Sequence, residues 1–74
     1  MSPRATQRLN RRSSKEAIQE AISSCIETEI SGWKETGRIG NSRPENEEEA
    51  RKQAAGLCYA EARRNAGAAK VPRG

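Results

Sequence analysis

The amino-acid sequence predicts an all-α protein, an antiparallel two-helix hairpin at residues 13–66 between two basic, flexible arms. Three observations lead to this fold class. Two stretches carry apolar residues three or four positions apart, a segment containing Gly and Pro separates them, and the chain has only 74 residues. A chain this short, with a mean hydropathy of -1.03, can build one small core at most. We therefore expect a single domain, marginally stable alone or assembled with a partner, with an N-terminal arm at residues 1–12 and a C-terminal tail at residues 67–74.

The first predicted helix begins at Ser13 or Ser14, because either serine is a good N-cap, and Glu16 lies in the first turn. It is expected to end near Gly37. The apolar residues of this helix have the spacing that places them on one face. That face consists of Ala17, Ile18, Ala21, Ile22, Cys25, Ile26, Ile30 and Trp33.

The second predicted helix starts close to Pro44, with Ser42 as the candidate N-cap, because the segment GRIGNSRP at residues 37–44 contains stop and turn signals in order. Acidic residues follow Pro44, and Arg63 and Arg64 lie near the other end, an order that complements the helix dipole. The apolar stripe of this helix is narrow and made mostly of small side chains. Its members are Ala50, Ala54, Leu57 and Cys58, with Ala62 as a further candidate.

Antiparallel pairing around a turn near residues 40 and 41 predicts which residues lie level with one another. Ile26 should lie beside Leu57, Trp33 beside Ala50, and Cys25 beside Cys58. Large side chains then face small ones, which favours close packing. The predicted helix-packing interface is Ile18, Ile22, Cys25, Ile26, Ile30, Trp33, Ala54, Leu57 and Cys58.

Three small residues in this region have more than one interpretation. Cys25 and Cys58 are expected to be small apolar core residues, compatible with reduced thiols in the cytoplasm. Because they lie level, oxidation should join them within one chain if their Cα atoms come within about 7 Å. Gly56 weakens its helix by about 1 kcal/mol relative to alanine, so it is either a tolerated glycine or the mark of a close approach by another chain.

Charge is arranged in three blocks along the chain. Residues 1–12 and residues 63–74 each hold four basic residues and no acidic one, whereas residues 13–62 hold six basic and ten acidic residues. Flexible basic segments attract phosphates or acidic protein surfaces without sequence preference, although such termini can also simply keep a protein soluble. Since a hairpin brings both arms to one end, the basic residues should act as one patch. The candidate binding residues are Arg4, Arg8, Arg11, Arg12, Arg63, Arg64, Lys70 and Arg73.

The residue types that carry catalysis or bind metal are scarce. The chain has no histidine and no glycine-rich phosphate loop, so a serine or cysteine nucleophile would have no histidine base. Two cysteines without CxxC spacing cannot complete a four-ligand zinc site. No stretch approaches the roughly 18 apolar residues that cross a membrane. We expect no enzymatic activity, no cofactor, no metal and no membrane partner.

The run RKQAAGLCYAEARRNAGAAKVPRG at residues 51–74, and more loosely SGWKETGRIGNSRP at residues 31–44, covers about the last 45 residues and resembles an uncharacterised family of very short proteins from tailed phages and large DNA viruses. The family signature is a glycine-containing turn, a basic pair followed by Gln-Ala, an alternating small and aliphatic stretch, Ala-Arg, a glycine, and a basic residue next to Val or Ile and Pro. The matching positions here are Arg51, Lys52, Gln53, Ala54, Ala62, Arg63, Gly67, Lys70, Val71 and Pro72. The family usually has isoleucines where this chain has Ala55, Gly56 and Cys58. The resemblance implies a viral origin and a location in the host cytoplasm or the virion, but no chemistry.

Three function classes are compatible with these features, in the following order. The first is a small virion- or DNA-associated accessory protein whose hairpin binds a larger protein or copies of itself and whose arms bind nucleic acid, without sequence preference, or an acidic surface. The second is an inhibitor or modulator of a host nuclease or polymerase that acts by direct protein binding. The third is a helix-turn-helix regulator, which is least favoured because the second helix begins with carboxylates that DNA phosphates would repel.

Overall fold

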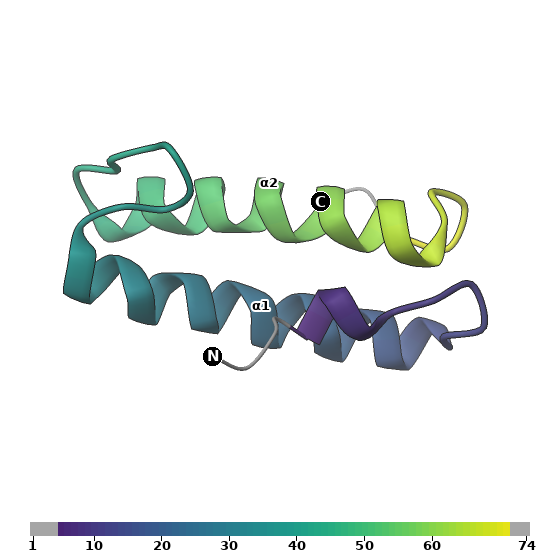
Figure 1. Cartoon of the computed structure of the whole chain (residues 1–74). Coiled ribbons are helices and arrows are strands. Elements are labelled where there is room, and N and C mark those ends of the chain that lie inside the picture. Colours follow the sequence, from purple (N-terminus) through teal and green to yellow (C-terminus); the bar gives the residue numbers. More distant parts are fainter. Residues whose placement is uncertain (1–4, 72–74) are drawn as a thin grey trace.

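The computed structural model describes residues 5–71 and has the shape of a helical hairpin (Figure 1). A short 3-10 helix, η1 (Ala5–Arg8), precedes two α-helices, α1 (Lys15–Thr36) and α2 (Glu47–Ala66). The two α-helices run antiparallel and pack against each other, and residues 5–71 contain no strand beyond one isolated bridge. The predicted all-α hairpin is confirmed.

Both ends of α1 lie where the sequence predicts them. Of the two candidate caps, Ser14 is the N-cap, and its Oγ accepts a hydrogen bond from the Ala17 N–H at 3.1 Å. At the other end Gly37 has a φ of 75°, in the left-handed region that glycine adopts without steric cost, and its N–H donates to the Trp33 carbonyl at 2.7 Å.

The predicted start of α2 near Pro44, with Ser42 as its cap, is wrong. Helix α2 begins at Glu47, and the N-cap is Asn46, whose side-chain oxygen accepts from the Glu49 N–H at 2.9 Å. The Glu49 carboxylate in turn accepts from the Glu45 N–H at 3.2 Å, so the first turn and the residues before it hold each other in place.

The connection between the helices explains why Ser42 does not cap α2. Ser42 forms an antiparallel bridge with Ile39, in which each N–H donates to the other residue's carbonyl at 2.9 Å. Two residues further on, the Pro44 carbonyl accepts from Trp33 Nε1 at 3.1 Å. These contacts use Ser42 and Pro44 to close the connection, and the helix can start only after them.

The core consists of a ridge of large side chains on α1 packed against a stripe of small ones on α2. Every fourth residue of α2 from position 50 to position 66 is buried, with at most 2% of its surface exposed, and these residues are Ala50, Ala54, Cys58, Ala62 and Ala66. On α1 the buried residues are Ile18, Ala21, Ile22, Cys25 and Ile30. Small side chains at every fourth position let the two helices approach closely.

The core is divided into two clusters that follow the predicted register. One lies toward the chain ends and contains Ile18, Ile22, Cys25 and Cys58. The other lies toward the connection, and in it Ile26 and Trp33 pack as half-buried residues with Leu57 against Ala50 and Ala54. The predicted pairs of level residues thus fall within common clusters.

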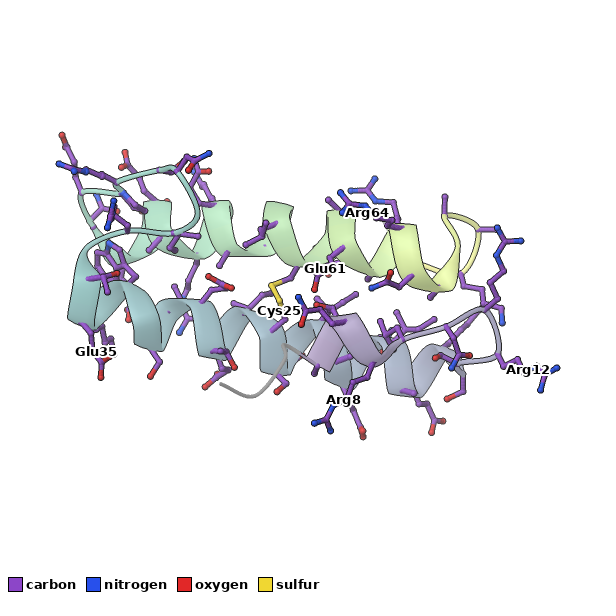
Figure 2. The ribbon with its side chains drawn as sticks, viewed as in Figure 1. Arg8, Arg12, Cys25, Glu35, Glu61 and Arg64 are labelled. Carbon is purple, nitrogen blue, oxygen red and sulfur yellow. A yellow bond between two sulfur atoms is a disulfide. The ribbon has the colours of Figure 1, made fainter. Side chains whose placement is uncertain are left out.

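A disulfide joins α1 to α2 between Cys25 and Cys58, whose Cα atoms are 5.9 Å apart (Figure 2). Both residues are fully buried. The predicted register, which places the two cysteines level within one chain, is confirmed by this distance. The sequence is also compatible with reduced thiols, whereas the structure holds the two cysteines as a disulfide.

Within the predicted N-terminal arm, residues 5–12 include η1, which packs against both α1 and α2. Thr6 is completely buried, and its hydroxyl donates to a Glu61 carboxylate oxygen at 2.6 Å. Its carbonyl accepts from the Asn65 side chain at 2.8 Å. Leu9 adds a half-buried contact to the cluster near the chain ends.

The C-terminal tail also packs against the hairpin as far as the structure describes it. Val71 is only 6% exposed and belongs to the cluster near the chain ends. The tail therefore turns back over the core at residues 67–71 instead of extending away from α2.

Candidate nucleic-acid interface

The end of the hairpin opposite the connection, called the open end here, is formed by two turns that lie side by side in Figure 1: residues 10–14 and residues 67–71. In the first turn the Asn10 carbonyl accepts from the Ser13 N–H at 3.0 Å, and the Asn10 side chain accepts from the Arg12 N–H at 2.7 Å. The Ser13 Oγ accepts from the Asn10 N–H at 3.0 Å. These bonds hold Arg11 and Arg12 at the exposed tip of an ordered turn.

The second turn begins where α2 ends. The Gly67 N–H donates to the Arg63 carbonyl at 3.0 Å, and Gly67 has a φ of 98°. The chain then reverses, with the Lys70 N–H donating to the Gly67 carbonyl at 3.2 Å. The Lys70 Nζ crosses the open end and donates to the backbone carbonyl of Arg11. This contact ties the N-terminal basic segment to the C-terminal one.

A fourth cation joins this group from the first turn of α1. Lys15 and Lys70, together with Gln19, line one open depression of about 260 Å³. We refer to Arg11, Arg12, Lys15 and Lys70 as the open-end cluster. All four side chains are exposed, so their charges are available to a large anionic surface.

The other predicted binding residues do not join this cluster. Figure 2 shows Arg12 at the open end, whereas Arg8 and Arg64 point to opposite sides of the hairpin. Arg63 lies in the last turn of α2, and its Nε donates to the Tyr59 carbonyl at 3.4 Å. Of the predicted binding residues that the structure describes, the open-end cluster contains Arg11, Arg12 and Lys70. The expectation that all eight cations act as one patch stays a prediction. Arg4 and Arg73 lie outside the described residues.

Sequence reasoning did not include Lys15 among the candidate binding residues. Its position directly after the Ser14 cap and close in sequence to Arg11 and Arg12 was the available signal. What could not be read from the sequence is that Lys70 reaches across to the first turn.

The densest group of acidic residues lies away from the open-end cluster, although Glu16 directly follows Lys15 in the first turn of α1. Glu47, Glu48 and Glu49 occupy the first turn of α2, at the far end of the hairpin, as the sequence predicts. Their ion pairs, Lys34 with Glu47 and Lys52 with Glu48, each have an N–O distance of 3.8 Å and are exposed. A duplex that approached along the whole hairpin would meet these carboxylates, whereas one that approached the open end would not.

No group of three or more His, Cys, Asp or Glu side chains in residues 5–71 is arranged to hold a metal ion. No helix within this range is long and apolar enough to cross a membrane.

Comparisons with known proteins give no family or structural relationship. No protein-family model, curated protein sequence or solved structure matches the chain. The resemblance of the C-terminal half to short viral proteins therefore stays a prediction.

Proposed function

We propose that the protein is a small, non-enzymatic accessory protein that binds nucleic acid without sequence preference through its open-end cluster. The observation that carries the proposal is the contact of Lys70 with the Arg11 carbonyl, since it gathers cations from both ends of the chain on one surface. Lys and Arg side chains that neutralise phosphates supply affinity without reading bases.

The distribution of charge supports an end-on mode of binding. The open-end cluster has four cations within two short turns and the start of α1, and the carboxylates at the start of α2 lie at the other end of the hairpin. A recognition helix in a DNA groove is disfavoured, because α2 would have to enter the groove with Glu47, Glu48 and Glu49 in its first turn.

The disulfide supports a virion over the host cytoplasm as the place of action. Disulfides persist in oxidising surroundings, including virion surfaces, and are rare in reducing cytosol. An accessory protein in a virus particle would keep the Cys25–Cys58 bond, and in that setting it would meet packaged nucleic acid at short range.

The test is the salt dependence of binding to random-sequence duplex DNA, followed by fluorescence anisotropy. Four phosphate contacts predict a log–log slope of about -3.6 for the binding constant against salt concentration. The double variant Arg12→Gln with Lys15→Gln should flatten the slope by about 1.8. Its matched control is Arg38→Gln with Arg43→Gln, which removes the same charge in the connection between the helices and should leave the slope unchanged.

Two results would contradict the proposal. If no duplex binding is measurable at low salt, the cluster does not bind nucleic acid, and an acidic protein surface becomes the better candidate partner. If the control variant loses as much affinity as the cluster variant, net charge and not this surface is responsible for binding.

A further inference from the structure

The solvent-facing side of α2 carries small residues between cations. Opposite the buried stripe, the exposed residues at successive fourth positions are Lys52, Gly56, Ala60 and Arg64, and Arg63 lies beside the last of them. A Cβ atom added to Gly56 would meet nothing within 4 Å. The backbone of α2 is thus open to a close neighbour at Gly56, with positive charge on both sides of it.

The solvent-facing side of α1 is the chemical complement of this surface. Its exposed residues include Glu16, Glu20 and Glu27, with Ser23 and Ser24 between them. This surface begins opposite the disulfide at Glu16 and reaches the edge of α2 at Glu27, which lines an open depression with Glu47 and Arg51. It therefore presents small hydroxyl side chains between carboxylates.

The spacing of the charges on the two surfaces is the same. Glu16 and Glu27 are eleven positions apart, and so are Lys52 and Arg63. Eleven residues make close to three helical turns and a rise of about 16.5 Å, so each pair lies in line along its own helix. Two cations on one surface can therefore meet two carboxylates on the other at the same time.

These charged groups are available for a partner. Within residues 5–71 no ion pair involves Glu16, Glu27 or Arg63, and Arg63 uses only its Nε, toward the Tyr59 carbonyl. Lys52 has an exposed pair with Glu48, a contact that is typically worth well under 1 kcal/mol and is readily exchanged.

We propose that copies of this chain associate head to tail, with α1 of one copy packed antiparallel on the solvent-facing side of α2 of the next. In this register Lys52 lies level with Glu27, and Arg63 lies level with Glu16. Gly56 lies level with Ser23, so the two small residues meet and the helices can approach closely. A parallel arrangement would instead place Gly56 against Glu20. Antiparallel packing also opposes the two helix dipoles favourably.

The two surfaces are different, so the contact is heterologous. One end of any assembly therefore has an unpaired α1 surface, and the other end has an unpaired α2 surface. Further copies can add to both ends, and the result is a row in which α1 and α2 alternate. The molecule measures 36 × 26 × 18 Å, so one helix face offers less than a standard interface, and we expect a dissociation constant of about 0.1–1 mM.

The test is sedimentation velocity of the oxidised full chain over protein concentrations up to about 1 mM, in about 20 mM salt, where charges are weakly screened. The wild type should sediment faster as its concentration rises, and the effect should disappear in about 1 M salt. Lys52→Glu with Arg63→Glu should weaken association by about 10-fold or more, and so should Glu16→Lys with Glu27→Lys.

The decisive step is to mix the two charge-reversed variants. In the first variant the α1 and α2 surfaces are both acidic, and in the second variant both are basic, so neither variant should associate alone. When the two variants alternate, every contact joins an acidic surface to a basic one, so the mixture should associate. Arg38→Glu with Arg43→Glu is the matched control for net charge and should associate like the wild type. A wild type that stays monomeric throughout, variants that associate as well as the wild type, or a mixture that shows no recovery would each overturn the proposal. None of these outcomes depends on nucleic-acid binding.

Discussion

Reduction of the Cys25–Cys58 disulfide is expected to remove a large part of the stability of this protein. The two cysteines are 33 positions apart, and closing a loop of that length in the unfolded chain is worth about 3.7 kcal/mol. A protein of this size has a free energy of unfolding of about 4–11 kcal/mol. The core beside the bond is thin, since α2 contributes mainly alanine to it. Reduction should therefore lower the Tm by about 15–30 °C.

The assay is thermal unfolding followed by circular dichroism, with and without a phosphine reductant, on protein whose oxidation state is checked by intact mass. The double variant Cys25→Ala with Cys58→Ala is the control, and its Tm should not respond to the reductant. Oxidised wild type should run as a monomer in non-reducing electrophoresis. A reductant-induced shift of less than about 4 °C would refute the reasoning, because the bond would then contribute less than about 1 kcal/mol. Exclusive formation of cross-linked dimers would show that the helices pair between chains.

Five further substitutions test the fold locally. Thr6→Ala should destabilise the protein by about 1–3 kcal/mol in urea unfolding, because it removes a completely buried hydroxyl and its hydrogen bond to the Glu61 carboxylate; an unchanged midpoint would mean that η1 does not dock. Gly56→Ala should stabilise by about 1 kcal/mol and Gly37→Ala should destabilise, since only Gly37 has a positive φ; equal signs in thermal unfolding would contradict this. Asn46→Ala should lower the free energy of unfolding by about 1 kcal/mol, because α2 loses its N-cap, whereas Ser42→Ala should leave the helical circular dichroism signal unchanged. A larger effect of Ser42→Ala than of Asn46→Ala would show that Ser42 caps α2, as the sequence predicts.

Local signals in the sequence were sufficient to predict α1 and the register of the hairpin. A serine cap, a glycine in the left-handed region and a regular apolar face all act within one helix, and they agree with one another. The level position of Cys25 and Cys58 follows from the turn and the antiparallel order alone. The start of α2 was harder to predict from the sequence, because Ser42 and Asn46 are both acceptable N-caps. The choice between them depends on the hydrogen bond from Trp33 of α1 to the Pro44 carbonyl in the connection.

The packing of the chain ends could not be predicted from local pattern. Thr6 is polar and stands between arginines, so nothing in its surroundings marks it as buried; its partners, Glu61 and Asn65, are 55 and 59 positions away. The grouping of the basic residues at the candidate site is equally hard to predict from local pattern. The basic residues were recognisable as a class, but their grouping depends on a contact between Lys70 and Arg11 and on the rotation of α2, which separates Arg64 from Arg12.

The docking of η1 has a consequence for the order of events during synthesis. At about 5–20 residues per second, Glu61 and Asn65, which are 55 and 59 positions after Thr6, are made about 3–12 s later than Thr6. Helix η1 therefore cannot dock as it does in the folded chain until the end of α2 has been made. Until then the buried environment of Thr6 does not exist, and the docking of η1 is a late step that completes the hairpin instead of a step that starts it.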